Sequence, residues 1–242
     1  LLHDDIIDES TLRRGKLVAN KVWSNAASVL VGDYLFSRAF EIMAQDSQEV
    51  LKILSEASVV ITQGELEQLT HVQNIALSIK DYEHIILSKT AALFAAGCEV
   101  GAVLGGNTLL RKPMHAFGQY FGLAFQVIDD MLDYSSTDKT LGKKVGDDFA
   151  EGKMTLPLLL LYKAATDTEK EQLKTIILNA KRTEADFKNV IVMMQHYNIQ
   201  EEAMQKARSY VEKAETALKD VTDSNEKTAL LDLLHYSLQR AF

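Results

Sequence analysis

The sequence predicts an all-α protein that forms a single large helical bundle. Over long stretches the apolar residues recur at helical rather than alternating spacing. Only two prolines and twelve glycines occur among 242 residues, of which 47% are hydrophobic. A chain of this length and composition can bury one sizeable core, and no stretch resembles a domain linker. We therefore expect one domain over residues 1–242.

The individual helices follow from the periodicity and from local start signals. Capping-box spacing or a first-turn proline marks four helix starts, at Ser78–Asp81, Thr166–Glu169, Pro113 and Pro157. The helices expected in chain order are 1–10, 22–44, 47–72, 79–106, 113–135, 157–165, 167–180, 184–196, 199–218 and 224–240. Loops are expected near 11–21, 73–78, 107–112 and 136–153, and a loop as long as the last is usually functional.

The stretch 91–106, "AALFAAGCEVGAVLGG", is rich in small residues that let helix backbones approach closely, which predicts a central helix. Glu99 interrupts this apolar run, and the run alone is too short to cross a bilayer. The single cysteine, Cys98, fits a reducing compartment, and no signal peptide is recognised, so we expect a cytoplasmic protein. Because Leu1-Leu2-His3 reads as mid-helix without a cap, we expect that N-terminal helices are missing from this chain.

The charge balance is acidic, with 34 aspartates and glutamates against 26 lysines and arginines and a net charge of −8. A nucleic-acid partner would call for a basic face, so this class of function is excluded. An anionic ligand remains compatible with the sequence if metal ions lie between the protein and the ligand.

Two acidic clusters share the spacing D-D-x-x-D, and both are surrounded by aliphatic residues. They consist of Asp4, Asp5 and Asp8 in "LLHDDIIDES" and of Asp129, Asp130 and Asp133 in "FQVIDDMLDY". On a helix, residues four apart lie on one face about 5–6 Å apart. At an effective dielectric constant near 20, two such charges repel by roughly 3 kcal/mol. The clusters therefore lower stability unless protons or cations neutralise them.

Three explanations of the clusters are open: solvated acidic turns, carboxylates that share protons, and metal sites. The apolar surroundings speak against solvated turns, and metal binding is favoured because the same spacing occurs twice. Neither cluster has the loop and glycine of a calcium site, no Glu-x-x-His di-iron pair occurs, and zinc would require cysteine or histidine. Oxygen-only ligands suit Mg²⁺, which shares its coordination shell with phosphate oxygens. We predict several Mg²⁺ ions around one diphosphate.

Basic residues near the clusters could bind the phosphate oxygens. They are Arg13 and Arg14 after the first cluster, Lys89 beside Thr90, and Lys143, Lys144 and Lys153 in the loop after the second cluster. The segment "GDDFAEGKMT" is not a phosphate-binding P-loop, because five residues separate its glycines, methionine follows the lysine and no strand precedes it.

With these residues in place, the whole chain resembles the trans-type polyprenyl diphosphate synthases, most closely the long-chain octaprenyl and decaprenyl members. "LLHDDIIDESTLRRG" and "FQVIDDMLDY" are similar to the two aspartate-rich motifs of this family. "GDYLFSRAF", "QGELEQL", "KTAALF" and "GKKVGDDFAEGKMTLPL" follow in the order of the family segments. The resemblance implies the isoprenoid synthase fold, a helical bundle around a deep central cavity.

The resemblance also implies roles for individual residues. It implies metal ligation by Asp4, Asp8 and Asp129, with Asp5, Asp130 and Asp133 ligating or supporting. It implies binding of the allylic diphosphate by Arg13, Lys89, Lys153 and Lys143 or Lys144, and of isopentenyl diphosphate by Arg14. Thr90, Gln126 and the Lys89 carbonyl are implied to lie near the allylic carbon.

The activity implied is Mg²⁺-dependent, with about three ions per site, and adds isopentenyl diphosphate head-to-tail onto an allylic diphosphate. Relatives are homodimers, and long-chain members make quinone side chains. The product is expected to pass to the membrane, although no transmembrane segment is expected in the chain. A shorter-chain farnesyl or geranylgeranyl synthase, a class I terpene cyclase and a non-catalytic partner subunit are the alternatives. A cyclase usually carries a different second metal motif, and a non-catalytic subunit would have degraded aspartates.

Overall fold

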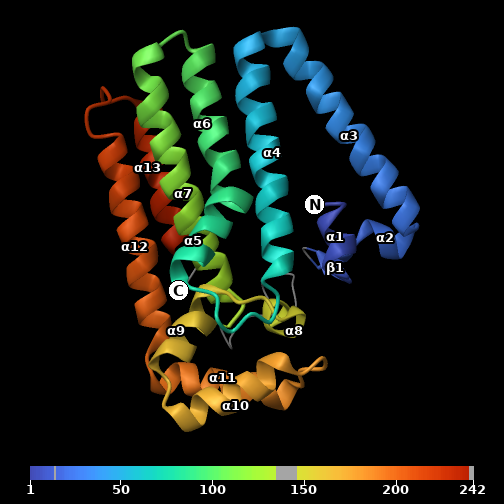
Figure 1. Cartoon of the computed structure of the whole chain (residues 1–242). Helices are drawn as coiled ribbons and strands as arrows, with labels where there is room; N and C mark the ends of the chain where they lie inside the picture. The colour runs from blue at the N-terminus through green and yellow to red at the C-terminus, as the bar shows by residue number, and fades with distance from the viewer. Residues whose placement is uncertain (14, 135–145, 240–242) are drawn as a thin grey trace.

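The computed structural model describes every residue except 14, 135–145 and 240–242, and it is almost entirely helical (Figure 1). Its elements in chain order are α1 (Asp4–Ile7), β1 (Leu12–Arg13), β2 (Lys16–Leu17), α2 (Ala19–Val22), α3 (Asn25–Asp46), α4 (Gln48–Thr70), α5 (Ile79–Ile86), the π-helical turn η1 (Leu87–Ala91), α6 (Ala92–Leu104), the 3₁₀ turn η2 (Thr108–Leu110), α7 (Arg111–Leu132), α8 (Asp147–Glu151), α9 (Leu156–Ala164), α10 (Asp167–Leu178), α11 (Glu184–His196), α12 (Ile199–Ala217) and α13 (Asn225–Gln239). The predicted all-α class is confirmed.

The bundle is built around α6 and α7. The α6 helix packs between α4 and α7, and α12 covers another side of α7. Helices α10 and α11 lie across one end of the bundle, whereas α3 diverges from α4 toward α2 (Figure 1). The main core runs along α7, α9 and α12, and its fully buried large side chains include Phe117, Ile128, Leu158, Leu161 and Leu218.

The prediction of a central small-residue helix is confirmed, but the neighbouring helices supply the glycines that matter. A Cβ added to Gly122 of α7 would lie 2.6 Å from the Cα of Ala91. A Cβ added to Gly64 of α4 would lie 2.6 Å from the backbone nitrogen of Lys89. By contrast, a Cβ at Gly97 within α6 would meet open space. The two glycines on α4 and α7 thus bring η1 against both helices.

Together α5, η1 and α6 form one continuous helical line over Ile79–Leu104. By length and composition this helix could cross a membrane, and it is the one such helix in the described part of the chain. The apolar run 91–106, on which the expectation of no transmembrane segment rests, is shorter than the helix that contains it. Here the helix packs against α4 and α7 as the central element of the bundle.

The structure corrects several boundaries. The expected helix 1–10 is only the four-residue α1, because Glu9 takes a positive φ of 52° that ends the helix. The expected loop 11–21 contains the antiparallel pair β1–β2, which turns at Gly15 with φ 74°, followed by α2. Within the expected loop 136–153, the described part contains α8.

Candidate active site

The first acidic motif lies on α1 and on the residue that ends it. Asp4 and Asp5 form the first turn, and the N–H of the C-cap Asp8 donates to the Asp4 carbonyl at 2.8 Å. The Asp5 side chain is buried, and its Oδ1 accepts from Nε and Nη2 of Arg13 at 2.8 and 2.7 Å. Asp4 is half-buried. Arg13, expected to bind a diphosphate, is therefore the partner of an aspartate of the motif.

The second motif begins in the last turn of α7, where the helix is packed into the core. Asp130 is 3% exposed and accepts hydrogen bonds from the Tyr82 hydroxyl at 2.6 Å and from Gln126 Nε2 at 2.7 Å. Gln126 Oε1 in turn accepts from the Thr90 hydroxyl at 2.8 Å. The structure thus brings the two predicted residues Thr90 and Gln126 together beside the motif.

The other two aspartates of this motif, Asp133 and Asp129, differ in how many hydrogen bonds their carboxylates accept. Asp133 Oδ1 accepts from the backbone N–H groups of Gly146 and Asp147 at 3.1 and 3.2 Å. Its Oδ2 accepts from the N–H of Asp148 at 3.1 Å, so both oxygens are used at the N-terminus of α8. The Asp129 carboxylate is half-buried and accepts no hydrogen bond from the described part of the chain.

Lys153 connects the two motifs. Its Nζ lies 3.0 Å from Asp8 Oδ1 and 2.6 Å from Glu151 Oε2, with Asp148 Oδ1 at 3.9 Å. Because Asp133 caps α8, the third aspartate of each motif is tied to the segment 146–153: Asp8 through Lys153, and Asp133 through backbone N–H groups. The ends of the two motifs therefore meet at one short segment of the chain.

Lys89 lies in the π-helical turn η1, a type of helical irregularity that is frequent at functional sites. Its ammonium group contacts both carboxylate oxygens of Glu65, at 2.8 and 3.0 Å, and donates to Gln68 Oε1 at 2.7 Å. Both partners are on α4, whose Gly64 allows η1 to approach. The side chain is consequently held in place at the contact between α4 and the central helix.

The electrostatics around α8 show a site rich in negative charge. Burial, reinforced by the charge of Asp148, raises the pKa of Asp130 and the pKa of Asp133 to about 8 each. Burial alone would lower the pKa of Lys153, but the carboxylates of Asp148, Glu151 and Asp8 outweigh it, so that pKa is raised. Burial and neighbouring negative charge therefore favour the neutral form of Asp130 and Asp133 when no cation is bound.

The donor set fits a magnesium ion by its chemistry. The candidate ligands are carboxylate oxygens, and the Lys153 ammonium among three carboxylates shows that a cation is stabilised beside Asp8. In the part of the chain that the structure describes, no three acidic, histidine or cysteine side chains are gathered closely enough to hold a metal ion. Shared metal binding by the two motifs stays a prediction.

Some predicted residues lie outside the described residues, and some residues of the site were not predicted. Arg14, Lys143 and Lys144 fall in the first group. The residues missed are Glu65, Gln68, Tyr82, Asp148 and Glu151. Glu65 and Gln68 belong to the segment "QGELEQL", which resembles a segment of the family. This resemblance could have identified them as candidate site residues. Nothing in the sequence links Tyr82 to a motif 48 residues away.

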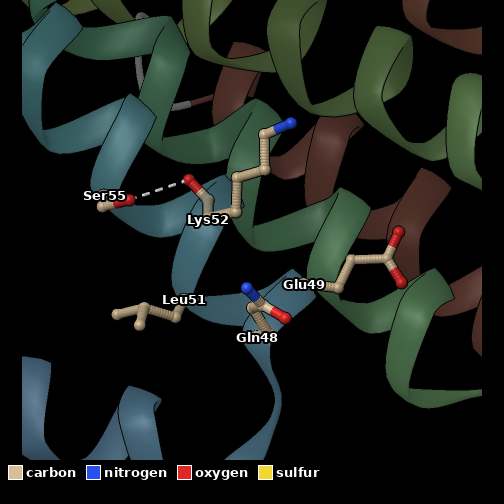
Figure 2. A pocket seen from close by; sticks show the side chains of 5 residues that line it. All are labelled: Gln48, Glu49, Leu51, Lys52 and Ser55. Atoms are coloured by element: carbon tan, nitrogen blue, oxygen red, sulfur yellow. Dashed lines mark hydrogen bonds between the residues drawn. The ribbon is translucent and has the colours of Figure 1, made fainter.

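Two surface pockets are separate from this site. Figure 2 shows a pocket of about 580 Å³ at the N-terminal end of α4, lined by Gln48, Glu49, Leu51, Lys52 and Ser55. The contacts of α4 with Lys89 are at its other end. A second pocket, of about 420 Å³, lies between α4, the central helix and α7 near the ion pairs of Arg111 and His115 with Glu99. Neither pocket includes a predicted site residue.

Comparisons with known proteins show the family of this chain. The polyprenyl synthetase family model matches residues 1–194. An octaprenyl diphosphate synthase of Haemophilus influenzae is 40% identical over the whole chain, which covers 74% of that protein. One of Escherichia coli is 41% identical over 99% of the chain and 75% of its own length.

Solved structures give the same result. The crystal structure of a polyprenyl synthase from Caulobacter crescentus, complexed with calcium and isoprenyl diphosphate, superposes with a TM-score of 0.95 at 42% identity, covering 100% of this chain and 74% of that one. A decaprenyl diphosphate synthase from Rhodobacter capsulatus gives a TM-score of 0.93 at 38% identity, covering 100% and 75%. The intact aspartate motifs, the fold and these matches lead to one conclusion: the chain belongs to the polyprenyl synthetase family and is a prenyl-transferring enzyme.

Proposed function

We propose that this enzyme adds isopentenyl diphosphate head-to-tail onto an allylic diphosphate and makes a long-chain all-trans polyprenyl diphosphate, the precursor of a quinone side chain. The observation that carries the proposal is the convergence of two intact D-D-x-x-D motifs on the segment 146–153. The long-chain product is supported by the similarity to two octaprenyl diphosphate synthases and a decaprenyl diphosphate synthase.

The aspartates divide into ligands and supports. Asp4 and Asp129 are half-buried, and Asp8 has Oδ2 in addition to the oxygen that accepts from Lys153, so these three are the proposed ligands of about three Mg²⁺ ions. Asp130 and Asp133 support them, because both carboxylate oxygens of each already accept hydrogen bonds within the protein. Asp5 supports them as well, because it is buried and paired with Arg13. Bound Mg²⁺ would supply positive charge for the diphosphate that leaves the allylic carbon.

The cationic side chains orient the substrates. Lys89 and Lys153 bind the oxygens of the allylic diphosphate, with Arg13 and Lys143 or Lys144 beside them, and Arg14 faces isopentenyl diphosphate. Lys89 is already positioned by Glu65 and Gln68 on α4. Binding the diphosphate by several fixed donors holds the reactants together without a covalent nucleophile.

The proposed reaction proceeds in three steps. The allylic C–O bond breaks and its electron pair leaves with the diphosphate. The double bond of isopentenyl diphosphate attacks the allylic cation and forms the new C–C bond. Loss of a proton, taken by the departed diphosphate, restores a double bond. Thr90 and Gln126, hydrogen bonded at 2.8 Å, and the carbonyl of Lys89 are proposed to face the developing cation.

Three further properties belong to this proposal. Residues 1–242 form one polyprenyl synthase domain, supported by a core that runs through α5, α7, α9, α11 and α12. The enzyme is a homodimer, which is supported by exposed apolar side chains on α3 such as Leu30 at 67% and Tyr34 at 63%. It works in the cytoplasm and delivers its product to the membrane, in keeping with the single free Cys98.

The test is incubation with Mg²⁺, farnesyl diphosphate and labelled isopentenyl diphosphate, followed by sizing of the products. We expect label in chains of about eight to ten isoprene units, the range from the similar octaprenyl to the similar decaprenyl diphosphate synthase. Products that stop at fifteen or twenty carbons would show a shorter-chain synthase, and a hydrocarbon would show a cyclase. No incorporation would show a non-catalytic subunit. Asp129→Ala is the control variant and is expected to incorporate about 10²–10³-fold less label.

A further inference from the structure

Tyr82 on α5 is a buried side chain that no step above uses. It is 3% exposed, and its hydroxyl donates to Asp130 Oδ2 at 2.6 Å. Asp130 is itself 3% exposed, so no solvent competes for this hydrogen bond. A short hydrogen bond to a buried carboxylate oxygen constrains both its position and its rotation.

This contact is the first of a chain of three hydrogen bonds that ends at the proposed reacting centre. Asp130 Oδ1 accepts from Gln126 Nε2 at 2.7 Å, which fixes which end of the Gln126 amide faces the aspartate. The amide oxygen Oε1 is then left to accept from the Thr90 hydroxyl at 2.8 Å. The chain therefore joins α5, α7 and η1, and it sets the orientation of each group that follows Tyr82.

The same contact bears on Asp129. Successive side chains of a helix point in directions about 100° apart. A contact that fixes one side chain therefore acts on the next one by holding the helical turn that carries both. Because Tyr82 and Gln126 hold the Asp130 carboxylate in the core, the last turn of α7 is fixed with Asp129 on the neighbouring, half-buried face. Removal of a group that hydrogen bonds to and orients a metal ligand typically lowers metal affinity or activity by 10–100-fold.

We propose that Tyr82 is a positioning residue for the prenyl transfer, acting through Asp130 on the proposed metal ligand Asp129 and through Gln126 on Thr90. This inference rests on the proposed function and adds a residue from outside both motifs. Tyr82 touches neither substrate nor metal in this role. Its hydroxyl supplies a fixed donor that a phenylalanine ring of the same shape could not supply.

The test compares Tyr82→Phe with Tyr197→Phe. Tyr197 is a matched control because its hydroxyl also donates to a carboxylate at 2.6 Å, that of Glu169, but on α10 at the end of the bundle. The measurements are the melting temperature in EDTA, the Kd for inorganic pyrophosphate in the presence of Mg²⁺, and kcat and KM for isopentenyl diphosphate.

For Tyr82→Phe we expect kcat to fall and the Kd of pyrophosphate to rise, each by about 10–100-fold, with KM for isopentenyl diphosphate within about twofold of the wild type. For Tyr197→Phe we expect wild-type kcat and Kd, and a smaller change in melting temperature than for Tyr82→Phe, because the Glu169 carboxylate still accepts from Thr166. Values of kcat and Kd within twofold of the wild type for Tyr82→Phe would overturn the inference. So would equal losses of kcat in both variants, because these would reflect stability alone.

A double substitution tests whether the effect runs along the chain of hydrogen bonds. If Tyr82 acts on Thr90 through Gln126, then Tyr82→Phe combined with Thr90→Val should lose less activity than the product of the two single losses. Strictly multiplicative losses would contradict this route. Failure of the proposed function is distinguishable, because the wild type would then incorporate no isopentenyl label while the Kd of pyrophosphate remained measurable.

Discussion

The two D-D-x-x-D motifs have the same spacing but are held by different means. In each, the middle aspartate is buried: Asp5 is 4% exposed and Asp130 is 3% exposed. Asp5 is bound by the charged guanidinium of Arg13, eight residues along the chain. Asp130 is bound by two neutral donors, Tyr82 and Gln126, the first of which lies on another helix. One motif lies on a four-residue helix, and the other ends a helix of 22 residues.

This difference teaches that spacing alone does not fix the electrostatic state of an acidic motif. Arg13 places a full positive charge beside Asp5 within the first motif. The second motif has no such partner among the described residues for Asp130, and burial raises the pKa of Asp130 to about 8. We infer that the second motif depends more strongly on added cations than the first. Four predictions test this comparison, beginning with the largest effect.

The largest effect is expected from removing the proposed ligands. Asp129→Ala and Asp4→Ala should each lower kcat by about 10²–10³-fold, because charge on the leaving diphosphate loses a stabilising centre. The melting temperature in EDTA should stay the same or rise, because repulsion within a cluster is relieved. The measurements are steady-state kinetics at saturating Mg²⁺ and thermal melts. Near-normal turnover in either variant would show that the metal assignment is wrong.

The next effect concerns the connection between the motifs. Lys153→Met keeps the aliphatic stem but removes the charge that lies among Asp8, Glu151 and Asp148. We expect kcat to fall by about 10–10²-fold and the melting temperature in EDTA to drop by several degrees, since three carboxylates lose their cation. Added Mg²⁺ should recover part of the lost melting temperature. Lys188→Met is the control, because Lys188 pairs with Glu184 at an exposed site.

A smaller effect is expected from pH. Aspartates of an unfolded chain have a pKa near 3.9, whereas the pKa values of Asp130 and Asp133 are about 8 in the folded protein. The folded state therefore binds more protons between these values, and its stability falls as the pH rises toward and through 8. In EDTA we expect the melting temperature to decrease from pH 5 to pH 9, and Asp133→Asn to flatten this decrease. A profile that rises over this range would contradict the assignment.

The smallest effect is expected from the first motif's own cation. Arg13→Lys keeps the positive charge but cannot reproduce the contact of two guanidinium nitrogens with Asp5. We expect a loss of about 1 kcal/mol, which corresponds to about 2–4 °C in melting temperature for a chain of this size. Differential scanning calorimetry measures it. A loss as large as that of Lys153→Met would show that Arg13, rather than Lys153, holds the first motif in place.

The sequence by itself determined the helical class, most helix boundaries and the two acidic motifs. Helical periodicity and caps are local properties, so Thr166 with Glu169 forms the predicted capping box, and α11 begins and ends at the predicted residues. The two motifs could be recognised from sequence because closely spaced aspartates among apolar residues are unfavourable unless something neutralises them. Resemblance to the family then supplied Gln126 and a role for Thr90. The structure places Lys89 against α4 and Thr90 against Gln126 of α7.

Only the tertiary structure decided which aspartates are free to bind a metal ion and which are occupied by hydrogen bonds within the protein. Which carboxylate is occupied depends on donors far away in sequence, such as Tyr82 for Asp130 and Lys153 for Asp8. The close approach of η1 likewise depends on Gly64 and Gly122 in other helices. The two hydrogen bonds join residues separated by 48 and 145 positions. Local pattern carries no information about such pairs, because packing rather than chain neighbourhood brings their atoms together.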